Sequence, residues 1–370
     1  MENKKIKRAL CAALAIYTLL FPLQMTASAV FESEGSDGYA ETLSEGVEVG
    51  SRLWELLFGN EKEKSDELTL SPGGNVFGVK IAQKYVTVTE SSGIPLLKAG
   101  DIITAINGKE ITSVSDVKSI LQKSNGNSVT ISALHRGEKI SIEAKPTLTD
   151  GEYRLGLSLR DGASGIGTVT FYDSETGLFG GLGHGICDSE SGEVISMKTG
   201  EVMGVVLGGV HRGECGKPGE LCGILKEQCL GSLTANSECG VFGIITDKDA
   251  FESAICDPLP VGKKGELKEG EAKIISTLKN GKSAEYSIEI YDIDVSSTGS
   301  KSFKIRVTDP TLVAISGGIV RGMSGSPIIQ NGKLVGAVTH VLVANPTEGY
   351  GIFIENMLNA ANAQMQKKAA

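Results

Sequence analysis

Short apolar runs separated by glycine-rich turns dominate the chain from about residue 68 onward. Residues 76–81 and 85–89 have the composition of strands, and the strand-like run 102–106 ends at the turn pair Asn107-Gly108. Residues 115–121 indicate a short capped helix, which is followed by a hairpin pattern at 128–132 and 139–142. We therefore expect a small mixed module over residues 67–147.

The remainder, residues 148–370, is predicted to be mainly β. Further strand-like runs lie at 165–172, 202–207, 240–245, 285–290 and 302–307, and residues 327–340 have the pattern strand, Asn-Gly turn, strand. Many short strands with turn signals between them favour a barrel or a sandwich. Met357, Leu358 and Ala361 then have helical spacing, which predicts a terminal helix.

The N-terminus has the layout of an export signal. Four basic residues within positions 4–8 precede an apolar stretch over residues 9–23, and Ala27-Ser28-Ala29 follows. The apolar stretch is shorter than the roughly 20 residues that span a bilayer comfortably. We expect residues 1–29 to be a signal peptide, with an uncleaved membrane anchor through residues 9–23 as the alternative. Residues 30–66 are polar and acidic and are predicted to be a linker.

Composition narrows the functional classes. The length of 370 residues allows two compact domains, and the net charge of −9 without a basic patch argues against nucleic acid as a partner. Six cysteines fall in one window, and an even number in an exported chain suits disulfides, whose pairing stays open. They lack CxxC pairs, so zinc is the less favoured alternative and we expect no metal site. They are Cys187, Cys215, Cys222, Cys229, Cys239 and Cys256.

Two glycine-rich segments carry candidate chemistry. Ser324 lies in Gly322-Met323-Ser324-Gly325-Ser326-Pro327, and His184 lies in Gly181-Leu182-Gly183-His184-Gly185. A serine that attacks a carbonyl needs a base, a group that orients the base, and backbone N–H donors for the oxyanion. Glycines beside Ser324 allow close approach of substrate and backbone. We interpret Ser324 as a nucleophile and His184 as its base.

Residues 99–111, AGDIITAINGKEI, together with the following helix and hairpin, resemble PDZ domains. The resemblance implies a module that receives a peptide as an added strand and captures its carboxylate with main-chain N–H groups. The expected peptide-binding residues are Val76, Phe77, Gly78 and Val79, where the carboxylate-binding loop would fall. A module that only packs against its neighbour is the alternative.

The hairpin after Ser324, the strand at 350–354 and the terminal helix resemble the C-terminal barrel of chymotrypsin-like serine proteases. This resemblance implies that the N–H groups of Gly322 and Ser324 form the oxyanion hole. The expected fold is mainly β, with an N-terminal PDZ domain followed by a chymotrypsin-like double β-barrel with a C-terminal helix.

One family matches in more detail. The GMSGSP segment and residues 165–168, 182–186, 307–310, 317–320 and 336–341 resemble the stage IV sporulation protein B peptidases. The resemblance implies an exported serine endopeptidase of endospore formers that needs no cofactor. It would cleave a membrane-bound regulatory protein in the space between forespore and mother cell, so that an intramembrane protease releases a sigma factor. It would also process itself, with peptide segments, its own included, held at the PDZ groove.

The same resemblance makes Asp309 the orienting acid. The order of ordinary chymotrypsin-like proteases favours Asp247 instead, and both stay open. The alternative from another class is a non-catalytic PDZ and β-barrel scaffold of the sporulation envelope. A housekeeping envelope protease of the trypsin-like PDZ class is disfavoured, because its PDZ domain follows the peptidase whereas here it comes first.

Overall fold

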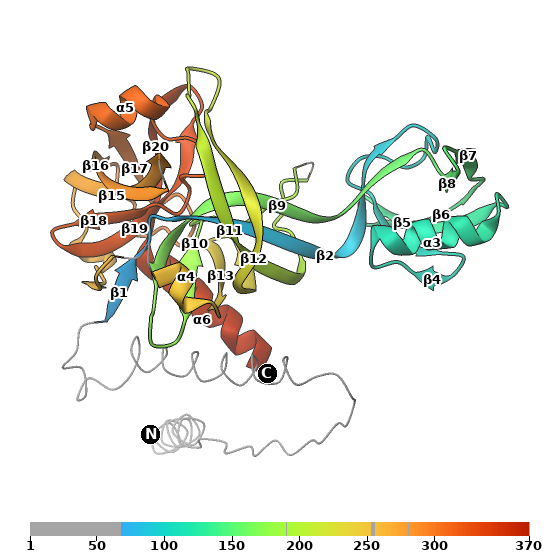
Figure 1. Cartoon of the computed structure of the whole chain (residues 1–370), viewed down its shortest axis with the longest axis horizontal. Coiled ribbons are helices and arrows are strands. Elements are labelled where there is room, and N and C mark those ends of the chain that lie inside the picture. The colour runs from blue at the N-terminus through green and yellow to red at the C-terminus, as the bar shows by residue number, and fades with distance from the viewer. Residues whose placement is uncertain (1–67, 190, 253–255, 280, 370) are drawn as a thin grey trace, which may run out of the picture. The chain divides into compact units, whose positions relative to one another are not determined.

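The protein is described by a computed structural model that covers residues 68–189, 191–252, 256–279 and 281–369. The expected export signal at 1–29 and the linker at 30–66 lie outside the described residues. Within them, no helix combines the length and apolar character that crossing a membrane requires. Most of the described residues lie in β-strands (Figure 1).

The PDZ-like module consists of a small sheet and one helix. Its helix α3 (Val114–Ser124) begins at Ser113, whose side chain accepts from the Asp116 N–H while the Asp116 carboxylate caps the Ser113 N–H. Val117 and Leu121 on the inner face of α3 are buried in the core of the module. The further elements are β3 (Ile102–Ile106), β4 (Lys109–Glu110), β5 (Val129–His135), β6 (Glu138–Ala144), β7 (Thr147–Thr149) and β8 (Glu152–Arg154).

Two long strands, β2 (Val76–Ser91) and β9 (Leu157–Tyr172), run through both parts of the fold. They pair antiparallel along two stretches, with a register break between Ala82 and Thr87 of β2. Beyond the break, β2 pairs with β3 of the PDZ-like module. Before the break, β2 pairs with β11 and belongs to the first barrel. One continuous strand therefore serves both parts.

The first barrel closes through these two strands. Its pairings run β9-β10-β13-β12-β11-β2, and because β2 also pairs with β9 the ring is complete. The buried side chains of Phe77, Phe179 and Val241 lie in its core. The elements are β10 (Leu178–Gly181), β11 (Met197–His211), β12 (Glu220–Ser237) and β13 (Gly240–Ile245), with α4 (Lys248–Glu252) after β13. Outside this ring, β1 (Thr69–Pro72) pairs with β9, and β14 (Leu259–Pro260) pairs with β1.

The second barrel is closed in the order β15-β16-β17-β20-β19-β18 and carries the orange to red strands of Figure 1. Asn331 and Gly332 have φ of 52° and 75° between β18 and β19, the left-handed values of an Asn-Gly hairpin turn. The elements are β15 (Gly270–Lys279), β16 (Lys282–Tyr291), β17 (Phe303–Val307), α5 (Pro310–Ser316), β18 (Pro327–Gln330), β19 (Lys333–Leu342), β20 (Asn345–Phe353) and α6 (Ile354–Ala369), with a 3-10 turn at Lys264–Glu266.

These observations confirm the expected mainly β fold with a PDZ-like module, barrels and a C-terminal helix. Met357, Leu358 and Ala361 of α6 are buried, as their helical spacing predicts. The disulfide expectation was wrong, since all six cysteines of the described chain are free thiols. Two of them, Cys215 and Cys239, instead lie against main-chain carbonyls of Ala344 and Thr298.

Candidate active site

Ser324 lies in the loop between α5 and β18, and two glycines give that loop its shape. Gly322 and Gly325 have φ of 94° and 97°, values that favour glycine. A Cβ on Gly325 would overlap the Thr168 carbonyl oxygen and approach the Leu182 nitrogen. The loop that carries Ser324 in the second barrel therefore lies directly against β9 of the first barrel.

Thr168 of β9 fixes this loop from both sides. Its Oγ1 donates to the Gly322 carbonyl at 2.7 Å, and its N–H donates to the Ser324 carbonyl at 3.0 Å. The Thr168 carbonyl accepts from the Leu182 N–H at 3.2 Å, two residues before His184. Thr168 is fully buried. One residue thus connects the serine loop with the histidine loop.

His184 follows β10 in a turn with unusual backbone angles. Leu182 and Gly183 have φ of 65° and 67°. A Cβ on Gly183 would lie 2.9 Å from the Thr339 Cγ2 atom and 3.1 Å from the Ile352 Cγ2 atom, so only glycine lets this turn approach β19 and β20 closely. The histidine loop of the first barrel is thereby brought to the second.

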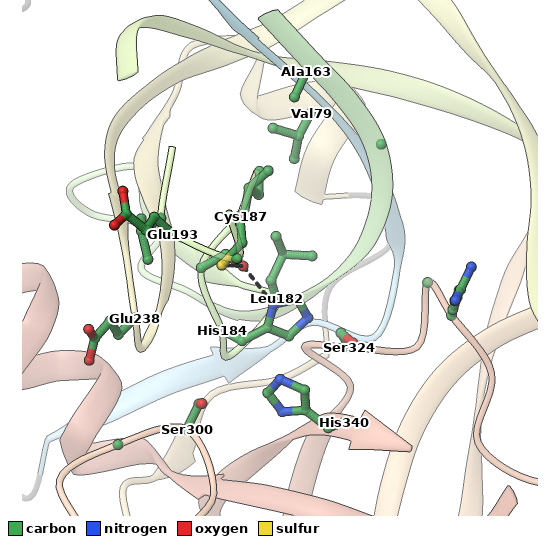
Figure 2. A pocket seen from close by; sticks show the side chains of 18 of the residues that line it. Val79, Ala163, Leu182, His184, Cys187, Glu193, Glu238, Ser300, Ser324 and His340 are labelled. Atoms are coloured by element: carbon green, nitrogen blue, oxygen red, sulfur yellow. Dashed lines mark hydrogen bonds between the residues drawn. The ribbon is translucent and has the colours of Figure 1, made fainter. Parts of the chain in front are cut away.

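His184 and Ser324 line one cavity of about 1140 Å³, together with Gly322 and His340 (Figure 2). The Nδ1 atom of His184 is 2.9 Å from the Gly185 carbonyl, which can only accept, so Nδ1 carries the proton and Nε2 is the basic nitrogen. Burial lowers the pKa of His184, and the hydrogen bond to Gly185 acts weakly in the opposite direction. The imidazole is therefore neutral at pH 7, as a general base must be.

The Ser324 hydroxyl donates to the Thr339 carbonyl at 2.7 Å. Rotation of the Ser324 side chain would release this bond and turn the hydroxyl toward a base such as His184. Catalytic hydrogen bonds commonly tighten only when substrate binds. Among the described residues, none accepts a hydrogen bond from the N–H of Gly322 or of Ser324. The N–H groups of Gly322 and Ser324 are thus available as donors to an oxyanion.

The two acids considered as partners of His184, Asp309 and Asp247, lie outside the Ser324 cavity. Asp309 is the N-cap of α5, and its carboxylate accepts from the N–H groups of Thr311, Leu312 and Ser287. It does not line the Ser324 cavity. The reserve candidate Asp247 accepts from the Gln228 side chain at 2.8 Å and is also outside the cavity. The structure therefore brings together the predicted serine and histidine but neither predicted acid.

The residues expected to bind peptide in the PDZ module lie in the first barrel. Val76–Val79 belong to the part of β2 before the register break, where Phe77 and Val79 are buried and Val79 lines the Ser324 cavity. Gly78 lies against Leu225. This differs from the expectation because one uninterrupted strand passes from barrel to PDZ-like module, and sequence alone does not show where it changes sheets.

The PDZ-like module has its own cavity, of about 630 Å³, beside α3. Val117 and Leu121 of α3 form one wall, and residues 152–159 form the other. The sequence analysis did not identify this second wall. Its signal is Leu155-Gly156-Leu157, an apolar-glycine-apolar run directly before a strand.

The fold and the shared serine–histidine cavity define a PDZ-containing serine peptidase. The chain belongs to the SpoIVB peptidase family, since the model of SpoIVB peptidase S55 matches residues 151–358, more than half of its length. The PDZ domain family matches residues 97–133. The search of curated proteins found no match.

Among solved structures, the PDZ domain of an SdrC-like protein from Listeria monocytogenes is similar at 25% identity, covering 22% of this chain and 93% of that chain with a TM-score of 0.20. The active form of the Rv3671c protease from M. tuberculosis is 12% identical, covering 55% of this chain and 74% of that chain with a TM-score of 0.31. Its inactive form is 13% identical, covering 55% and 85%, with a TM-score of 0.30.

Proposed function

We propose that this SpoIVB-like serine peptidase cleaves peptide bonds with Ser324 as nucleophile and His184 as general base. The observation that carries the proposal is the single cavity that both side chains line, although one comes from the first barrel and the other from the second. The connection through Thr168 holds the two loops together without substrate. Such preorganisation is what a nucleophile and its base require.

The reaction would run through an acyl-enzyme. The Ser324 hydroxyl leaves the Thr339 carbonyl, gives its proton to Nε2 of His184, and its oxygen attacks the scissile carbonyl carbon. The N–H groups of Gly322 and Ser324 stabilise the negative charge on the carbonyl oxygen. His184 then donates the proton to the departing amine, and water repeats the sequence to release the acid. The Gly185 carbonyl keeps His184 in the tautomer that this cycle needs.

The substrate class follows from the family and the PDZ-like module. We propose that the chain is exported through residues 1–29 and cleaves a membrane-bound regulatory protein between forespore and mother cell, which starts intramembrane proteolysis of a sigma-factor precursor. The groove between α3 and residues 152–159 would hold an extended peptide of the substrate or of the chain itself. Self-processing would then use the same cavity at Ser324.

The experiment compares full-length wild type with Ser324→Ala, His184→Ala and Ser326→Ala, the last as a matched control from the same loop. Each protein is treated with a fluorophosphonate probe, and its fragments are weighed by mass spectrometry after incubation. We expect labelling and self-cleavage in the wild type and the Ser326→Ala protein, and neither in the other two. A folded wild type that takes up no probe would favour the non-catalytic scaffold.

A further inference from the structure

A second imidazole lies against the proposed base. The ring centroids of His184 and His340 are 4.9 Å apart with an angle of 38° between the ring planes. Both rings line the cavity of Ser324. Figure 2 shows the two rings facing each other, with Ser324 beside them in this view. From its place after a strand-like run, His340 is expected to wall the substrate cleft, with a role as base as the less favoured alternative.

The local backbone explains how His340 reaches this position. The pairing of β19 with β20 shifts register between Val338 and His340, which is a β-bulge at Thr339. Bulges occur beside active sites, where they redirect side chains. Here the Thr339 hydroxyl donates to the Ser300 and Tyr350 carbonyls. The Thr339 carbonyl accepts from Ser324.

The same bulge therefore serves both members of the catalytic pair. Its residue Thr339 holds the nucleophile, and the next residue, His340, contacts the base. Thr339 makes its contact through the main-chain carbonyl, and His340 makes its contact through the side-chain ring.

His340 also has an unused polar atom. Its Nδ1 is buried and has no hydrogen-bond partner among the described residues. Buried polar atoms are nearly always paired, and an exception at a functional site calls for an explanation. Burial, and after it the neighbouring His184 and Lys301, together lower the pKa of His340 to about 4. His340 is thus a neutral imidazole at pH 7.

The other ionisable groups that line this cavity are Cys187, Glu193, Glu238, Lys301 and Arg321. Tyr350 lies opposite His340 on the paired strand β20 and is a further ionisable neighbour. His184 and His340 form the ring pair. Among the described residues, the His184 ring hydrogen-bonds to a main-chain carbonyl and to no carboxylate.

We propose that His340 is a positioning residue of this peptidase: it holds the His184 ring in its orientation and, as a neutral imidazole, stabilises the imidazolium that forms during acylation. The inference rests on the proposed function. In the proton transfer, the O–H bond of Ser324 breaks and an N–H bond forms at Nε2 of His184. His340 neither gains nor loses the proton. The Gly185 carbonyl, which accepts from Nδ1 of His184, has the place of the carboxylate of most serine peptidases, and His340 is a second neighbour of the ring.

The first test measures the rate at which a fluorophosphonate labels Ser324 in the full chain at pH 7. His340→Phe keeps an aromatic ring without nitrogens, and we expect labelling to slow at least roughly tenfold. His340→Gln keeps a polar acceptor and should be intermediate. Added imidazole should speed the labelling of His340→Ala. His211→Phe is the matched control, because the His211 side chain is mostly exposed, pairs with Glu220 at 3.5 Å and does not line the Ser324 cavity. Its labelling rate should equal that of the wild type.

The second test does not depend on activity. In the Ser324→Ala background, the titration of His184 is followed by NMR at its ring C–H signal, with and without His340→Phe. Because a neutral imidazole supports the charged form of His184, we expect removal of His340 to lower the pKa of His184. Thermal unfolding of each variant checks that it is folded.

Two results would overturn the inference. A His340→Phe protein that is labelled at the wild-type rate would do so and leave the peptidase proposal intact. Normal labelling of His184→Ala together with loss of labelling in His340→Ala would make His340 the base itself, and it would also refute the role proposed for His184 while leaving Ser324 as the nucleophile. If the folded wild type is not labelled, the peptidase proposal fails. The NMR titration is then the only test of the inference. An equal pKa of His184 with and without His340→Phe would refute the role of His340.

Discussion

Replacing Thr168 by valine should damage the site without touching the catalytic groups. Valine has nearly the shape of threonine but has no hydroxyl, so the substitution removes the 2.7 Å hydrogen bond to the Gly322 carbonyl. The backbone bonds of Thr168 to Ser324 and Leu182 stay in place. The change is therefore confined to one contact on the loop that carries the proposed oxyanion donors.

The size of the expected effect on labelling follows from the loss of this one hydrogen bond. A carbonyl that loses its donor in a partly buried position costs about 1–3 kcal/mol. If the loop recovers about half of that by moving, the N–H groups of Gly322 and Ser324 leave their positions. Each 1.4 kcal/mol lost in transition-state stabilisation slows a reaction about tenfold. We expect fluorophosphonate labelling of Thr168→Val to slow by about tenfold or more and its unfolding midpoint to fall by a few degrees.

Two variants control this experiment. Thr168→Ser keeps the hydroxyl and should be labelled at close to the wild-type rate. Thr234→Val removes a comparable bond, from Oγ1 to the Phe242 carbonyl at 3.2 Å, in the same barrel but away from the serine loop. It should lower stability without slowing the labelling. Equal labelling rates for Thr168→Val and Thr168→Ser would refute the reasoning.

Three further outcomes are expected. Asp309→Asn should keep both the α5 cap and the labelling, because asparagine caps a helix as well as aspartate does. Asp309→Ala should lose about 1 kcal/mol of stability. A folded Asp309→Asn protein that is not labelled would show that Asp309 is catalytic. Labelling should persist at pH values below 6.5, because burial lowers the pKa of His184 and the neutral base is lost only as the pH falls through that lowered pKa. A labelling rate that is already halved above pH 6.5 would contradict this. Gly325→Ala should abolish labelling and destabilise the fold, because the new Cβ would overlap the Thr168 carbonyl. Gly332 has φ of 75° but open space around it, so Gly332→Ala should cost only backbone strain and leave labelling unchanged.

Local signals in the sequence predicted most elements of the fold. Asn331-Gly332 and Asn107-Gly108 take the left-handed angles of hairpin turns. Ser113 caps a helix that was expected from residue 115 and is observed from Val114. These features depend on a few neighbouring residues, so a single sequence is sufficient to predict them.

Features that depend on distant contacts could not be predicted in this way. The strand β2 continues through two sheets, and only the register break after Ala82 shows which part belongs to the PDZ-like module. This explains why Val76–Val79 were expected in the peptide groove and lie in the barrel instead.

In the candidate site, too, local features could be predicted from the sequence and distant contacts could not. Ser324 and His184, which the glycine-rich segments marked, line one cavity, and their catalytic roles stay a prediction. Asp309 lies where a helix begins, and its carboxylate is used by the N–H groups of that helix, which the run Val307-Thr308-Asp309-Pro310 also predicts on grounds of capping. The closeness of His340 to His184 results from a bulge at Thr339, and no residue pattern marks that bulge.

Peptide mapping of the labelled full-length chain decides most directly whether two barrels meet around one nucleophile and one base. After brief exposure to a fluorophosphonate, tandem mass spectrometry should find one adduct, on Ser324, in the wild type and none in the folded His184→Ala protein. An adduct on another residue, or equal modification of Ser324 without the imidazole at position 184, would contradict the mechanism.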